Sequence, residues 1–228
     1  MSGANNPFVE SKRFLLLSII MIGSVWGLVE ATAGIGLRGT CARLYSGSLL
    51  SGASLLFFSG AYVLTGRLPL VLLLPVIAGL FRLYSGLLVG QPLMSGAVAN
   101  PIYAFIVEAI AFCAVIYLVK QKHVKSLVGG SLAGMTAAVL SANMFLPVKF
   151  FTGIPACVVP GTDFPLCIWG LPAAMAVAAV STPLGFRGGA WIRRRIEAPT
   201  EGRGRVLVGA SVVVSAVCLL AVTVLHVR

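Results

Sequence analysis

Seven apolar runs follow one another along this chain, and each is long enough to cross a lipid bilayer. A spanning α-helix needs about 20 predominantly apolar residues. Only 10% of the residues are charged, whereas a soluble domain carries about 25%. The sequence therefore predicts an all-α, polytopic integral membrane helix bundle of six to seven spans. The runs cover roughly residues 13–36, 47–65, 69–90, 96–119, 126–148, 164–186 and 205–226.

Most connections between these runs are short, which leaves no room for a separate soluble domain. We expect a six-helix transmembrane core with an outward-facing polar pocket over residues 1–186. A basic cytoplasmic linker would follow over 187–204, and a seventh membrane helix over 205–228. As an alternative, the stretch RRRIEAPTEGRGR would end the main domain ahead of an accessory anchor.

The net charge of +11 lies mainly between the apolar runs. Lys and Arg concentrate on the cytoplasmic side of membrane proteins and contact anionic lipid headgroups there. A cytoplasmic N-terminus gives twelve cations inside and four outside, so we expect the C-terminus outside a plasma (inner) membrane. The partner indicated by this charge is the lipid bilayer, with no nucleic acid. The four outer cations are Arg38, Arg43, Lys149 and Arg228.

Polar residues of five spans fall in the outer half or the middle of the membrane in this orientation. Intramembrane ionisable groups are rare, usually face a bundle interior, and mark function by default. Their shared depth predicts a substrate-binding pocket open to the outside. The candidate residues are Glu30, Arg82, Tyr84, Asn100, Glu108, Asn143 and Trp169.

Structural roles for the same residues remain open at this point. Glu30 or Glu108 could form an ion pair with Arg82 that fixes helix register. Asn100, which precedes a proline, could cap its span. Asn143 could make an interhelical hydrogen bond, and Trp169 could be an aromatic residue of the membrane interface.

Two cysteines flank the outer loop ACVVPGTDFPLC. Cys157 and Cys167 would lie in an oxidising compartment, where disulfides persist. We therefore predict a disulfide between them, with Cys41 as a competing partner. A metal site is not expected, because no histidine is close by.

Small residues recur every fourth position in the first span, at Gly23, Gly27 and Ala31, and form a smooth ridge. Such ridges let helices approach closely. The ridge would serve either internal packing or the docking of another membrane subunit. Gly130 and Gly134 form a similar pair in the fifth span.

The chain lacks the motifs of most enzymes and cofactor proteins. Its two histidines, His123 and His226, sit in a basic loop and at the C-terminus, which argues against a haem or a Ser–His site. It has no nucleotide-binding fingerprint. We expect no cofactor and lean against an enzyme, and any ATP-driven function needs a partner.

The segment GAVANPIYAFIVEAIAF and the Gly23/Gly27/Ala31 ridge resemble features of the substrate-binding S components of energy-coupling factor transporters. The resemblance covers roughly residues 13–186. It implies a protein that captures a micronutrient from outside and docks on a transmembrane coupling protein driven by two ABC-type ATPases. The seventh span and the glycines of the ridge depart from the usual S-component pattern.

The expected function is capture of a small anionic or zwitterionic solute. Arg82 would hold an anionic group, Asn100 and Asn143 would hydrogen-bond its polar edges, and loops 38–46 and 150–163 would close over the site. One alternative is a non-catalytic subunit that anchors a larger, possibly redox, complex and contacts another chain or a quinone. Another is an outward-facing enzyme on lipid-linked substrates that uses Glu30, Glu108 or Asp163.

Overall fold

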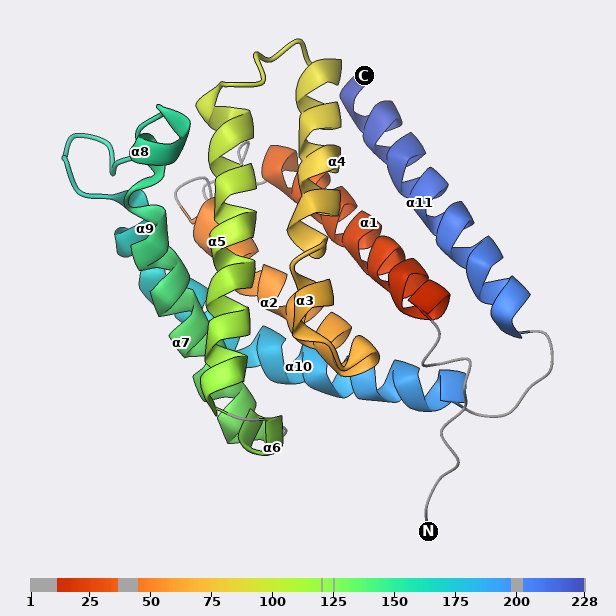
Figure 1. Cartoon of the computed structure of the whole chain (residues 1–228). Coiled ribbons are helices and arrows are strands. Elements are labelled where there is room, and N and C mark those ends of the chain that lie inside the picture. Colours follow the sequence, from red (N-terminus) through yellow and green to blue (C-terminus); the bar gives the residue numbers. More distant parts are fainter. Residues whose placement is uncertain (1–11, 37–44, 120, 125, 198–202, 228) are drawn as a thin grey trace.

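The structure is a computed structural model that describes residues 12–36, 45–119, 121–124, 126–197 and 203–227 (Figure 1). Apart from one isolated bridge between Val158 and Pro165, the regular structure of these residues is helical. The helices are α1 (Lys12–Gly36), α2 (Ser46–Thr65), α3 (Leu68–Val71), α4 (Leu74–Leu88), α5 (Gly96–Val119), α6 (Gln121–Val124), α7 (Leu127–Phe145), α8 (Val148–Thr152), α9 (Leu166–Trp169), α10 (Leu171–Glu197) and α11 (Arg203–Val227).

Six helical segments are long and apolar enough to cross a membrane, by length and composition. They confirm six of the predicted spans, and the chain is a multi-pass membrane protein of the all-α class. The segments are Phe14–Thr32, Ser46–Thr65, Leu68–Leu88, Gly96–Val119, Leu127–Phe145 and Gly209–His226.

The predicted span over 164–186 has a different outline in the structure. The short helix α9 ends at Trp169, and α10 begins at Leu171 and continues through Glu197, well into the predicted linker. The second half of α10 carries four arginines, and this helix is not among the six segments above. Of the predicted linker, residues 198–202 lie outside the described part of the chain.

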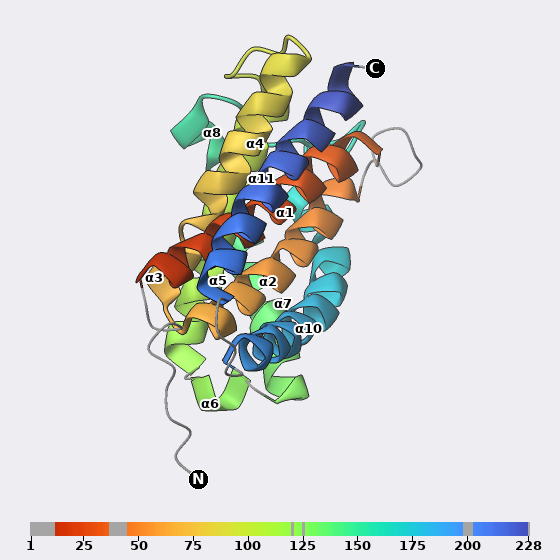
Figure 2. The ribbon, with the colours of Figure 1, turned by 90° about the vertical axis from the view of Figure 1, so that its right-hand side faces the viewer.

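The helices pack in two groups, which are joined by α5 and by the contact between α1 and α2 (Figures 1 and 2). In one group α10 lies along α2 and α7, and in the other α1 lies against α4 and α11. Helix α5 contacts α2, α4 and α7. The chain alternates between two ends, which we name the α8 end and the α6 end after the short helices found there (Figure 1).

Glycines make the contact between α2 and α10 unusually close. A Cβ atom on Gly189 would lie 2.5 Å from the carbonyl oxygen of Gly60, and one on Gly185 would lie 2.3 Å from that of Leu56. Both neighbours are backbone atoms, so they cannot turn aside. Small residues at an interface let helix backbones approach, and this is the main source of packing between helices in lipid.

The predicted ridge on α1 serves internal packing. A Cβ atom on Gly23 would lie 2.9 Å from Ile77, and one on Gly27 would lie 2.7 Å from Phe81. Both neighbours belong to α4. Ala31 is fully buried against Phe81 and residues of α11. Of the two roles considered for this ridge, the structure therefore has the packing role.

Candidate functional site

Glu108 lies at the middle of α5 and is buried among side chains of α2. The hydroxyl of Ser54 donates a hydrogen bond of 2.7 Å to its carboxylate, and Ser51 supplies a second hydroxyl. Helices α2 and α5 run in the same direction, so residues four positions further along both helices also contact each other. One turn further along each helix, Phe58 meets Phe112 with ring centroids 5.9 Å apart.

Glu30 faces the same region from α1. Its carboxylate accepts a hydrogen bond of 3.2 Å from the indole nitrogen of Trp26, one turn earlier in the helix. It interacts electrostatically with Glu108 and, with opposite sign, with Arg82. The side chains of Glu30 and Glu108 are only 6% and 5% exposed. Two carboxylates thus share the interior of the bundle.

Aromatic rings form the wall next to these carboxylates. The indole ring of Trp26 lies 5.0 Å from the ring of Phe58 and 5.0 Å from that of Phe105, and it stacks on Phe57 at 6.4 Å. Aromatic faces attract cations, most strongly where water is absent. Trp26 and Ser54, which donate hydrogen bonds to the carboxylates, are neutral groups, and Arg82 supplies one positive charge that acts on Glu30. Two ionised carboxylates with one positive charge nearby leave a net buried negative charge, which is costly. The arrangement therefore suits a cationic ligand group.

Arg82 of α4 and Asn100 of α5 both lie near the start of α5, toward the α8 end. Pro101 lacks an N–H group, so the carbonyl of Ala97, four residues earlier, loses its normal helical partner. The Arg82 guanidinium replaces it: Nε donates to this carbonyl at 3.0 Å, and Nη2 donates to it as well. Pro101 lies inside α5, and Arg82 of α4 supplies the donor that the Ala97 carbonyl lacks.

Asn100 holds the segment that follows α8. Its side-chain amide donates to the carbonyl of Pro155 at 3.2 Å, while Ile154 packs against Gly96 at the start of α5. The side chain is 6% exposed, and its Oδ1 atom is buried without a hydrogen-bond partner in the described structure. Asn100 thus has an unused acceptor beneath residues of the predicted closing loop 150–163.

Three predicted site residues lie elsewhere. The Tyr84 hydroxyl is 2.8 Å from Thr223 of α11, and Asn143 is exposed and donates to Val139 of its own helix at 2.8 Å. Trp169 packs on Tyr45, with ring centroids 4.6 Å apart. The contacts of these three residues are therefore with other partners than Glu30 and Glu108. The predicted loop 38–46 lies mostly outside the described residues.

The serines on α2 and the contacts of α11 were not predicted from the sequence. Serine is common throughout this chain. Ser54 differs from other serines only in facing Glu108, which the sequence does not indicate. The Ser24 hydroxyl lies 2.9 Å from Ser215, and that of Ser85 lies 2.7 Å from Nε2 of His226. These contacts attach the last helix to α1 and α4.

The predicted disulfide is wrong in this structure, where Cys157 and Cys167 are both free thiols. Backbone hydrogen bonds close the hairpin instead, from Val159 to Phe164 and from Leu166 to Cys157, each at 2.9 Å. This register pairs Cys157 with Leu166, so the two cysteines are not opposite each other. Cys41, the predicted competitor, lies outside the described residues.

The described residues contain no group of three or more His, Cys, Asp or Glu side chains that could hold a metal ion. Comparison with known proteins gives no match either: no family model, no curated protein and no solved structure is similar to this chain. The features of the chain that indicate a function are therefore Glu30, Glu108 and their neighbours.

Proposed function

We propose that this protein is a membrane transport protein that captures a small zwitterionic solute and works with an ATP-driven partner module. The observation that carries the proposal is the pair of buried glutamates from α1 and α5, which accept hydrogen bonds from Trp26 and Ser54 and lie beside aromatic rings. A cationic group of the solute would compensate the buried negative charge. This narrows the expected ligand from an anion or zwitterion to a zwitterion.

Asn100 and Arg82 would bind the other end of the solute. The unused Oδ1 atom of Asn100 can accept an N–H or O–H group. Arg82 is held on the Ala97 carbonyl through Nε and Nη2, and a guanidinium has five N–H donors in all. An anionic group near Arg82 and a cationic group near the glutamates would orient a zwitterion along the bundle.

The α8 end would be the entrance, which the positive-inside distribution places on the outer side of a plasma membrane. The segment over Asn100 would open and close by breaking the hydrogen bond to Pro155. A left-handed glycine, Gly153 with φ of 73°, precedes this segment and provides a turn that other residues rarely adopt. Release on the inner side and the energy for it would come from the partner module.

A thermal-stability screen of the purified protein against small zwitterions tests this proposal. A solute that binds the folded protein raises its unfolding temperature, by an amount that grows with the logarithm of the solute concentration above the Kd. Glu108→Gln and Glu30→Gln should abolish the rise, and Arg82→Ala should weaken it. Asn143→Ala is the matched control, because Asn143 is exposed and bonds only its own helix. Unchanged binding in Glu108→Gln and Arg82→Ala would refute the proposed site.

A further inference from the structure

Helix α8 carries two exposed aromatic side chains. Phe150 is 94% exposed and Phe151 is 71% exposed, whereas Val148 of the same helix is fully buried. Successive residues of a helix turn by about 100°, so Phe150 lies on the side of α8 opposite to Val148. Neither phenylalanine belongs to the six segments that are long and apolar enough to cross a membrane. An exposed apolar surface of this kind marks a contact with a protein or with a membrane.

The ring of Phe151 indicates the depth of α8. It stacks on the ring of Tyr103 in α5, with centroids 5.6 Å apart and an angle of 22° between the planes. Tyr103 lies about 10 Å along α5 from its first residue, Gly96, at a rise of 1.5 Å per residue. Its hydroxyl donates to the carbonyl of Met144, in the last turn of α7, at 3.2 Å. Since α5 and α7 are both membrane spans, Phe151 lies at the edge of the hydrocarbon layer at the α8 end.

The exposed side of α5 continues from this contact toward the middle of the membrane. Ile106 and Ile110 follow Tyr103 along α5 at a spacing that places all three side chains on one face of the helix. The two isoleucines are 43% and 42% exposed. In a bilayer such side chains contact acyl chains, which are as apolar as they are. Phe151 therefore extends a face of the bundle that contacts lipid.

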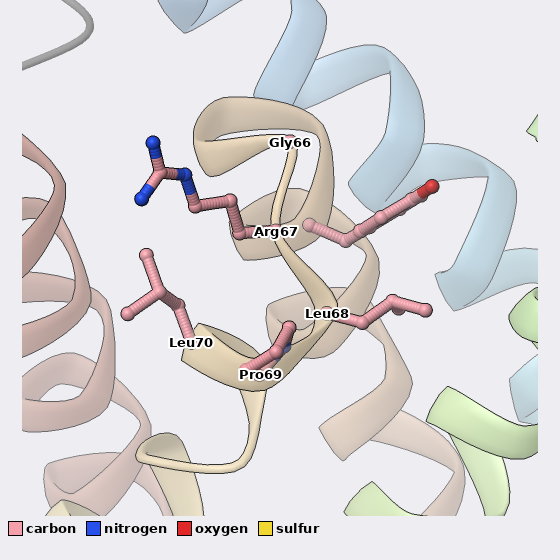
Figure 3. Close-up of a pocket in the computed structure, with 6 residues that line it drawn as sticks. Gly66, Arg67, Leu68, Pro69 and Leu70 are labelled. Carbon is pink, nitrogen blue, oxygen red and sulfur yellow. The ribbon is translucent and has the colours of Figure 1, made fainter.

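The α6 end of the bundle has a different surface. At the turn between α2 and α3, beside a cavity of about 520 Å³, the left-handed Gly66 ends α2 and is followed by the exposed Arg67 (Figure 3). The Arg67 side chain projects away from Leu68 (Figure 3). An arginine keeps its charged head in water or among the headgroups, so the chain leaves the hydrocarbon at this turn. A phenylalanine has no polar group that must reach water, so α8 can remain in the lipid.

We propose that α8 lies in the membrane interface and inserts Phe150 and Phe151 among the acyl chains of the leaflet at the α8 end. The partner of this surface is the lipid bilayer itself. Interfacial helices bury their apolar face about 5–10 Å into the boundary between headgroups and acyl chains. The exposed Lys149 has a side chain long enough for its ammonium group to reach the headgroups.

The predicted closing loop 150–163 then has two parts. Residues 150–152 lie in the lipid, and Gly153 turns the chain toward Pro155, whose carbonyl accepts the hydrogen bond from Asn100. The segment over Asn100 is thus attached to the bilayer through α8. This surface shares no residue with the glutamate site on α1 and α5, so it does not depend on the transport proposal.

Spin-label accessibility of the full chain in vesicles of phosphatidylcholine and phosphatidylglycerol tests the proposal. The nitroxide is attached to Phe150→Cys in a background whose five native cysteines are replaced by alanine. Oxygen concentrates in the hydrocarbon, whereas a water-soluble nickel chelate stays outside it. We expect the ratio of oxygen collisions to nickel collisions at Phe150→Cys to approach that at Ile106→Cys on the lipid-facing side of α5. Because Phe150 is 94% exposed, its replacement removes few contacts, and the unfolding temperature should equal that of the background.

Asp163→Cys is the matched aqueous control, because Asp163 is exposed on the hairpin that follows α8. Its collision ratio should be severalfold lower than that at Phe150→Cys. Equal ratios at these two positions would place Phe150 in water and overturn the proposal. Few collisions with either reagent at Phe150→Cys would also overturn it, since they would show that a second copy of the chain or another protein covers α8.

Discussion

The hydrogen bond between Ser54 and Glu108 should couple the two residues energetically. Ser54→Ala removes the hydroxyl that lies 2.7 Å from the carboxylate. A hydrogen bond to a charged group contributes about 1.5–3 kcal/mol, whereas a neutral interhelical one in a membrane averages about 0.6 kcal/mol. In a Glu108→Gln background, the Ser54 hydroxyl still has the Ser51 carbonyl at 2.7 Å. We therefore expect a coupling energy of about 1–2 kcal/mol.

A double-mutant cycle on reversible unfolding in mixed micelles would measure this coupling. Ser59→Ala is the matched control, because Ser59 also lies on α2, is also fully buried, and donates to the Leu55 carbonyl of its own helix at 2.6 Å. Its coupling to Glu108→Gln should stay within about 0.5 kcal/mol, as for independent sites. Coupling of Ser54 no larger than that of Ser59 would refute the geometry proposed for this site.

Three further predictions concern packing, the second glutamate and the hairpin. Gly189→Ala should lower the free energy of unfolding by about 1–3 kcal/mol, because its Cβ atom would meet the Gly60 carbonyl. Gly188→Ala, whose Cβ atom meets nothing within 4 Å, should be neutral or stabilising. If both variants lost the same free energy of unfolding, the close contact between α2 and α10 would be contradicted. Trp26→Phe should cost about 1–2 kcal/mol by removing the donor to Glu30, and most of this loss should disappear in a Glu30→Met background. In single-cysteine variants, maleimide should modify the exposed Cys157 faster than Cys167, because burial raises the pKa of the Cys167 thiol and lowers its thiolate fraction. The Cys167 rate should rise as the pH rises, and equal rates at neutral pH would argue against the burial of Cys167.

The spans were predictable because bilayer thickness fixes the length of an apolar run. This rule works for α5 and α7, which are predominantly apolar from end to end. It fails to place the end of α10, because a helix can continue past the membrane when its last turns carry arginines. The length of an apolar run does not indicate how far the helix continues beyond the hydrocarbon layer.

The candidate site was predictable in part, because position along a span gives depth but not direction. Consecutive helical residues turn by about 100°, so two residues at one depth can face opposite ways. Glu30 and Glu108 both point into the bundle, whereas Asn143 points outward. The predicted disulfide failed for a similar reason, since spacing in the sequence does not give the register of a hairpin.

The most direct test is mass spectrometry of the native protein, extracted gently from its own membrane, with and without Glu108→Gln. We expect the wild type to retain a small zwitterionic molecule that the variant lacks, together with a second membrane protein and two ATPases. An unchanged set of small molecules in Glu108→Gln, or co-purified catalytic or electron-carrying subunits in place of ATPases, would contradict the transport proposal and favour an anchoring subunit.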